Sequence, residues 1–201
     1  MEITDKANNS QVESEQLDFI EAIMKDFKYP WFIAGGWSID LGIGKITRVH
    51  EDMDICIFRE NIAAILTYFI EWDIINVTIP GESRLEKVTT IRDTESPRYC
   101  LHLTKGQQFI EILLTDNVDG QIPYRRDSSI KISHEDFVRT DDTGRNYIAP
   151  ELQLLYKASS CRPKDQLDFE NFLPVMSSKQ IEWLRVALMK AHPTSSWIQY
   201  L

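Results

Sequence analysis

Residues 32–58 read FIAGGWSIDLGIGKITRVHEDMDICIF, a run that joins an apolar segment, a glycine pair and two aspartates. Asp52 and Asp54 are separated by one residue and lead into the strand-forming segment ICIF. Strand side chains alternate between two faces, so both carboxylates point the same way, with Cα atoms roughly 6.5–7 Å apart. Aspartate is depleted in strands, so a pair on one face needs a specific reason.

This spacing suits a hard cation shared by the two carboxylates. Magnesium typically takes one or two protein carboxylates together with substrate phosphate oxygens. A two-ion phosphoryl-transfer site needs a further carboxylate from a neighbouring strand. Glu111 in QFIEILL (108–114) is also a charge within an apolar strand, so we expect it to be a metal ligand, a general base or both. A structural salt bridge is the alternative for Glu111.

The glycine pair Gly35-Gly36 ends the apolar run WFIA (31–34) and leads into a short helical segment, 37–44. Glycines at such a turn let backbone amides approach phosphate oxygens, and a helix N-terminus favours anions. A lone D-x-D or Gly-Gly is common and carries little information. Their combination, in the order strand, Gly-Gly, helix, strand and D-x-D, favours a catalytic site.

The elements around this run predict an α+β fold in which helices flank a mixed sheet. An apolar stripe from Leu17 to Phe27 indicates a first helix, ended by Pro30, and residues 62–70 show helical spacing. Three β-rich runs, at 86–92, 98–104 and 108–114, predict an antiparallel continuation of the sheet.

From Pro150 onward the sequence pattern is typical of helices. We expect helices beginning at Pro150 and across 164–173, and a third that starts at a capping box formed by Ser177 and Gln180. The predicted organisation is a flexible arm (residues 1–13), a sheet domain (14–148) and a carboxy-terminal helical region (149–201).

Composition and charge limit the classes of partner. The chain has 201 residues, of which 43% are apolar, and a formal net charge of −9, which disfavours nucleic acid and favours cationic small molecules. Cys56, Cys100 and Cys161 are odd in number and lack metal-ligand spacing, which argues against a disulfide framework and a zinc site. No segment reads as an export signal or a membrane span, so we expect a cytoplasmic protein with no membrane partner.

The stretch GGWSIDLGIGKITRVHEDMDICI (35–57) resembles the antibiotic-modifying branch of the polymerase-β-like nucleotidyltransferase superfamily, in particular the aminoglycoside and lincosamide nucleotidyltransferases. The residues that carry the resemblance are Gly35, Gly36, Trp37, Asp40, Leu41, Gly44, Thr47, Arg48, His50, Asp52, Asp54 and Ile55. A looser likeness covers residues 147–169 and 192–201. The superfamily more often has serine or threonine where this chain has Trp37, a residue typical of the antibiotic-modifying branch.

The resemblance implies a magnesium-dependent enzyme that moves a nucleoside monophosphate from a nucleoside triphosphate to a hydroxyl of a small molecule. The acceptor would be an aminoglycoside-like or lincosamide-like antibiotic, and pyrophosphate would be released. Asp52, Asp54 and Glu111 would hold a pair of Mg²⁺ ions. The alternatives are a macromolecular acceptor, tRNA or protein, and a non-catalytic nucleotide-binding regulatory module.

A further group of residues is proposed to contact the nucleotide, and three of them have a structural alternative. The residues proposed to contact the nucleotide are Gly35, Gly36, Trp37, Arg48 and Lys164. The alternative for Trp37 is a core position, which is the commoner one for tryptophan next to a turn. The alternative for Arg48 is an ion pair with Glu51 or Asp40, and that for Lys164 is a solvated helix charge.

The remaining candidates lie around the same predicted site. Asp40 would orient the acceptor, cap the helix or pair with Arg48, and His50 would support the site through a hydrogen bond rather than as a ligand. Lys157 and the Arg125-Arg126 pair would contact phosphate or substrate, with simple solvent exposure as the alternative.

Overall fold

The structure is a computed structural model that describes residues 14–82 and 84–201. Its main strands are β1 (Trp31–Ile33), β2 (Asp54–Phe58), β3 (Ile74–Thr78), β4 (Leu85–Lys87), β5 (Cys100–Lys105), β6 (Gln108–Thr115), β9 (Val138–Thr140) and β10 (Asn146–Ile148). Within the described residues they form one sheet in the order β4-β3-β5-β6-β2-β1-β10-β9. A separate hairpin pairs β7 (Gln121–Tyr124) with β8 (Asp127–Ser133). The arm predicted for residues 1–13 lies outside the described residues.

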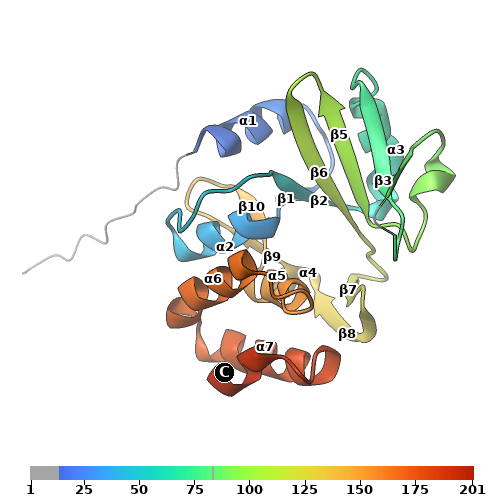
Figure 1. Ribbon diagram of the computed structural model, residues 1–201. Coiled ribbons are helices and arrows are strands. Elements are labelled where there is room, and N and C mark those ends of the chain that lie inside the picture. Colours follow the sequence, from blue (N-terminus) through green and yellow to red (C-terminus); the bar gives the residue numbers. More distant parts are fainter. Residues whose placement is uncertain (1–13, 83) are drawn as a thin grey trace, which may run out of the picture.

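Helices cover the sheet and form the carboxy-terminal part of the chain (Figure 1). They are α1 (Glu15–Met24), α2 (Gly35–Ile43), α3 (Ile62–Tyr68), α4 (His134–Phe137), α5 (Pro150–Lys157), α6 (Pro163–Phe172) and α7 (Ser178–Ala191). Short 3₁₀ turns occur at Arg59–Asn61, Ile91–Thr94, Leu173–Val175 and Ser196–Tyr200. None of the helices in the described part of the chain is long and apolar enough to cross a membrane.

The sheet is mixed, as predicted. Strand β2 runs parallel to β6 and antiparallel to β1, while β5 pairs antiparallel with both β6 and β3. The parallel register places Asp54 directly opposite Glu111. The sheet therefore brings together two carboxylates that are far apart in the sequence.

Two apolar cores lie on opposite faces of β2. Ile55 and Ile57 belong to the core that packs against α1 and α3, whereas Cys56 and Phe58 belong to the core formed with α5, α6 and α7. This alternation is the one predicted for the strand. Figure 1 shows α5, α6 and α7 gathered on the side of the molecule away from α1. Asp54 is the first residue of β2, at the end of the strand that is less buried than the rest.

Several predicted boundaries need correction. Helix α1 ends at Met24 rather than at Pro30, and α3 ends at Tyr68, which leaves Ile70 75% exposed. The strand predicted over residues 86–92 is confined to β4, because a capping box at Thr90 begins a 3₁₀ turn.

The helices after β10 follow the sequence prediction closely. Pro150 occupies the first turn of α5, where its missing N–H costs no hydrogen bond. Ser177 and Gln180 form the expected capping box of α7. Strands β3, β7, β8, β9 and β10 were not predicted; β9 and β10 have only three residues each, too few to show a period.

Candidate active site

The glycine pair forms the first two residues of α2, just after β1, and is packed against the side chains of the site. Gly35 has a φ of +62°, and a Cβ there would lie 1.9 Å from Asp54 Oδ2. A Cβ on Gly36 would lie 2.2 Å from Arg48 Nη2. The backbone N–H of Gly35 donates to Gln153 Oε1 at 3.2 Å. The pair therefore makes room for Asp54 and Arg48 in addition to any role it has toward phosphate.

Gly35→Ala is expected to disturb folding and activity together. The added methyl group overlaps Asp54, and alanine is strained at a positive φ. We expect a loss of stability of about 1–3 kcal/mol and displacement of the Asp54 carboxylate. Chemical denaturation and transfer rates measure the two effects, and Gly81→Ala is the matched control, since Gly81 also has a positive φ but open space around it. Equal losses of stability and of transfer rate in Gly35→Ala and Gly81→Ala would contradict the packing role of Gly35.

Asp54 and Glu111 lie directly opposite each other on the parallel strands β2 and β6. Burial, followed by the negative charges of Glu111 and Asp52, raises the pKa of Asp54 to about 7. A buried aspartate beside other carboxylates holds its proton more tightly than a free one, and a divalent cation would relieve the same crowding of negative charge. Their oxygens are the donors that a hard divalent cation prefers.

Asp52 lies just before β2 and is half-buried. Its charge acts on Asp54, but among the described residues the three predicted carboxylates do not bring one ligand atom each within 4.8 Å of one another. The structure thus brings together two of the three predicted ligands.

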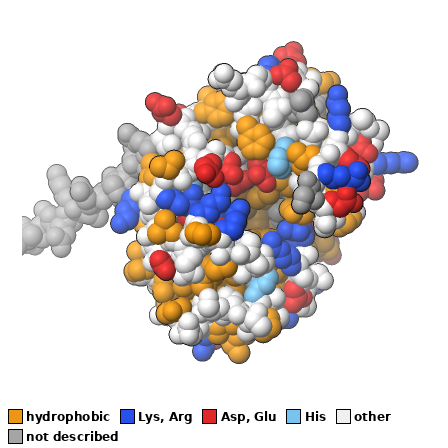
Figure 2. Space-filling model, viewed as in Figure 1, with side chains coloured by type: hydrophobic (Ala, Val, Ile, Leu, Met, Phe, Trp, Pro, Cys, Tyr) orange, Lys and Arg blue, Asp and Glu red, His pale blue; other side chains and the backbone are white. Residues whose placement is uncertain are grey.

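A cavity of about 280 Å³ opens beside Asp54 and Glu111. The charged groups on the rest of its wall are basic: Arg125, Arg126, Lys157 and Arg162. In Figure 2, basic and acidic side chains lie next to each other across the middle of the face shown, beside a hollow. Two carboxylates facing a basic wall is an arrangement that suits a metal-bound polyphosphate.

Aromatic rings line the same cavity. The Arg125 guanidinium lies 3.4 Å from the centroid of the Tyr99 ring, and the backbone N–H of Arg125 donates to the Tyr156 hydroxyl at 3.4 Å. The Arg126 guanidinium donates to the Tyr156 carbonyl at 2.6 Å. Both arginines are exposed residues, yet they are held in place against the cavity rather than being freely solvated.

Arg48 takes a different partner from the two considered in the sequence. It makes a bidentate ion pair with Asp168 on α6, with Nε–Oδ1 at 2.7 Å and Nη2–Oδ2 at 3.0 Å. The alternative to nucleotide contact considered from the sequence, an ion pair with Glu51 or Asp40, is therefore replaced by one with Asp168. Lys164 is the residue that pairs with Glu51, at 3.3 Å near the surface.

Lys157 is buried between two carboxylates of α6. Its Nζ lies 3.1 Å from Asp165 Oδ1 and 2.9 Å from Asp168 Oδ2. Burial opposes ionisation of Asp165, but hydrogen bonds and charge from Arg162 and Lys157 lower the pKa of Asp165 to about 2. Lys157 is therefore not a solvated helix charge; it belongs to a fixed charge network that reaches the cavity wall.

Asp40 and His50 form a buried support behind the glycine pair. Asp40 Oδ2 lies 2.6 Å from His50 Nε2, and Asp40 Oδ1 accepts a hydrogen bond from the Thr47 hydroxyl at 2.6 Å. Trp37 is 3% exposed and its ring centroid lies 4.2 Å from that of His50. Trp37 is therefore part of the core, and Asp40 is engaged with the loop before β2. His50 supports the site through hydrogen bonding, as its predicted role requires.

The sequence interpretation missed Cys100 and His102 on β5. Cys100 Sγ lies 2.8 Å from Glu111 Oε1, and His102 Nε2 lies 3.8 Å from the same oxygen. The available signal was their i, i+2 spacing, which puts both side chains on one face of a strand.

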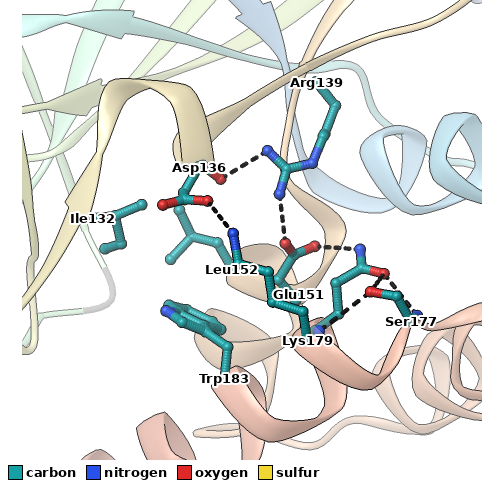
Figure 3. Close-up of a pocket in the computed structure, with 9 residues that line it drawn as sticks. Ile132, Asp136, Arg139, Glu151, Leu152, Ser177, Lys179 and Trp183 are labelled. Atoms are coloured by element: carbon teal, nitrogen blue, oxygen red, sulfur yellow. Dashed lines mark hydrogen bonds and ion pairs between the residues drawn. The ribbon is translucent and has the colours of Figure 1, made fainter.

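A second cavity, of about 290 Å³, lies between α4, α5 and α7 (Figure 3). Its charged groups pair with each other: Arg139 with Glu151 at 2.8 Å, and Lys179 with Asp136 at 3.1 Å. Neither Asp54 nor Glu111 lines this cavity. The candidate site is therefore the cavity beside the carboxylate pair.

Comparisons with known proteins identify a family match over part of the chain and several solved structures with a similar fold. Residues 16–89 match the aminoglycoside-2''-adenylyltransferase family. The lincomycin-bound lincosamide antibiotic adenylyltransferase LnuA is 18% identical, with a TM-score of 0.57 over 83% of this chain and 99% of its own. ANT(2'')-Ia in complex with adenylyl-2''-tobramycin is 16% identical, with a TM-score of 0.58 over 88% of this chain and 98% of its own. No curated protein matches the chain.

The solution structure of the antibiotic-resistance factor ANT(2'')-Ia is 15% identical, with a TM-score of 0.57 over 92% of this chain and 95% of its own. At these identities the solved structures show a shared fold. The family match runs from α1 into β4 and includes the glycine pair and Asp54 but not Glu111. The family match over residues 16–89 and the shared fold confirm the predicted resemblance to the antibiotic-modifying nucleotidyltransferases.

Proposed function

We propose that this enzyme moves a nucleoside monophosphate from a magnesium-bound nucleoside triphosphate to a hydroxyl of a small molecule, with release of pyrophosphate. The observation that carries the proposal is the Asp54–Glu111 pair facing a basic cavity wall. The acceptor class is an antibiotic of the aminoglycoside or lincosamide type. The proposal keeps the division into a sheet domain, residues 14–148, and a helical region, 149–201.

The donor set fits magnesium. Asp54 and Glu111 would supply oxygen ligands, and the raised pKa of Asp54 reflects its burial and then the nearby negative charge, which a divalent cation would relieve. Asp52 is proposed as a further ligand of the same site. Bound magnesium would neutralise the triphosphate and lower the barrier to attack on the α-phosphorus.

The chain's own residues perform the other tasks. Glu111 is the proposed group that accepts the proton of the acceptor hydroxyl, since it lines the cavity and stands beside Asp54. Lys157 and Arg162 are proposed to bind phosphate oxygens of the nucleotide, because both line the cavity. The contacts of Gly35, Gly36, Trp37, Arg48 and Lys164 with the nucleotide stay predictions; the burial of Trp37 and the pairing of Arg48 favour positioning roles for these two.

Pyrophosphate release tests the proposal. Each of the common nucleoside triphosphates is incubated with Mg²⁺ and a panel that includes aminoglycosides, lincosamides and a tRNA. We expect release that depends on one of the antibiotics. Release only with tRNA would favour a macromolecular acceptor. Nucleotide binding without release for any acceptor would contradict transfer and favour the regulatory module.

The pH dependence follows from Asp54. Its folded-state pKa, about 7, exceeds the ordinary aspartate value, so the folded state holds the proton more tightly than the unfolded state. Without metal, the contribution of Asp54 to the free energy of unfolding falls as pH rises from the ordinary value toward about 7. Magnesium affinity and transfer should rise over the upper part of this range, since the cation needs the ionised form.

Magnesium titrations below and above pH 7 measure this effect. Increasing the magnesium concentration should shift the rise in transfer rate to lower pH, because the cation competes with the proton on Asp54. A profile that does not move with magnesium concentration would contradict the assignment of Asp54 as a ligand.

A further inference from the structure

A second group of metal-ligating side chains lies beside the Asp54–Glu111 pair. Cys100 and His102 share one face of β5, and the antiparallel register places Glu111 directly opposite His102 and diagonal to Cys100. Glu111 Oε1 lies 2.8 Å from Cys100 Sγ and 3.8 Å from His102 Nε2. One ligand atom from each of the three residues lies within 4.8 Å of the other two.

The three donors are a thiol, an imidazole and a carboxylate. Magnesium and calcium prefer oxygen ligands throughout, whereas sulfur with nitrogen and one carboxylate oxygen is a set that zinc accepts. Three protein ligands leave a fourth tetrahedral position for water or another group. Of the three residues, Glu111 also lines the cavity beside Asp54.

We propose that Cys100, His102 and Glu111 form a binding site for Zn²⁺ that is distinct from the magnesium site but shares Glu111 with it. Zinc binding replaces the S–H bond of Cys100 by a Zn–S bond, and the thiol proton is released to solvent. No redox change is involved. The cysteine count and local spacing argued against a zinc site because they did not take strand pairing into account.

The surroundings give an ion access and hold the ligands in place. The Cys100 residue is 2% exposed, but the side chains of His102 and Glu111 are 27% and 25% exposed. The His102 ring packs edge-on against Phe109, with centroids 5.4 Å apart. All three ligands lie on paired strands, which fixes their separation more tightly than loops would.

The shared ligand gives the site a regulatory consequence, which rests on the proposed function. A Glu111 carboxylate bound to zinc cannot at the same time bind magnesium or take the proton of the hydroxyl group that is modified. Zinc should therefore inhibit transfer, and the inhibition should weaken when Cys100 is replaced.

The probe for the site is Co²⁺, which substitutes for zinc and gives a thiolate-to-metal absorption band when cysteine is a ligand. The full-length protein is titrated with Co²⁺ without nucleotide, and Zn²⁺ is then added in competition. We expect one equivalent of Co²⁺ with the thiolate band, abolished by zinc. Cys100→Ser should remove the band, and His102→Gln should weaken Co²⁺ binding by at least about 100-fold, beyond the effect of losing an outer partner.

Cys161→Ser is the matched control, because Cys161 is the exposed thiol and lies outside the cluster. It should leave the band unchanged. Thermal unfolding of each variant shows whether it is folded, and His102→Gln supplies a second test if Cys100→Ser is not. Absence of the band in folded wild-type protein, or its loss in Cys161→Ser with retention in Cys100→Ser, would overturn the proposal. Because no nucleotide is present, this outcome is independent of whether transfer occurs.

Discussion

Asp54→Asn is expected to lower kcat/KM for nucleotidyl transfer by about 10³-fold, the upper range for removing one preorganised electrostatic group from an active site. Asparagine has nearly the size of aspartate and fits the space beside Gly35, so packing is preserved. The substitution removes one of the two carboxylates that face each other across β2 and β6. Pyrophosphate release under saturating magnesium measures the loss.

Glu86→Gln is the control for this variant. Glu86 is also a strand carboxylate, on β4, but it pairs at the surface with Arg98 and Arg84 and does not line the cavity. Its replacement should leave kcat/KM close to wild type, as expected for a surface ion pair. A fall of less than about tenfold for Asp54→Asn, about 1.4 kcal/mol of transition-state stabilisation, would contradict a metal-ligand role.

Asp168→Ala is expected to lower the free energy of unfolding by about 3–5 kcal/mol, the range for breaking a buried ion pair from one side. The Asp168 side chain is fully buried and accepts from both Arg48 and Lys157. Without it, Arg48 loses a bidentate partner and Lys157 keeps only Asp165. Uncompensated positive charge would then remain in a poorly hydrated region.

Glu170→Ala tests whether the loss is specific to this network. Glu170 lies on the same helix, α6, but is exposed, and its contact is a hydrogen bond from Gln166 at 2.8 Å. Its replacement should change stability by no more than about 0.5 kcal/mol. Urea denaturation of the three proteins gives the comparison. A loss below about 1 kcal/mol for Asp168→Ala would show that the network contributes no more than a surface pair.

The parts of the site that depend on local sequence could be predicted. The alternation in β2 and the D-x-D spacing put Asp54 on a defined strand face, and the glycine pair marked the position where β1 gives way to α2. Glu111 could be selected because a charge flanked by isoleucines is unusual in a buried strand. The parallel pairing of β2 with β6 then placed it opposite Asp54.

The parts that depend on distant partners could not be predicted. The ion-pair partners weighed for Arg48 were close to it in the sequence, yet its partner Asp168 is 120 residues away on α6. Lys157 resembled an ordinary helix charge because its burial arises from packing between α5 and α6. Cys100 and His102 gained significance only when β5 paired with β6.

Magnesium-dependent nucleotide binding tests the central claim most directly. Calorimetric titration with a non-hydrolysable nucleoside triphosphate, with and without Mg²⁺, is carried out on wild-type protein and on Asp54→Asn. The account predicts that magnesium tightens nucleotide binding to the wild type and that this enhancement is lost in Asp54→Asn. Equal enhancement in both proteins would contradict a metal site built on Asp54.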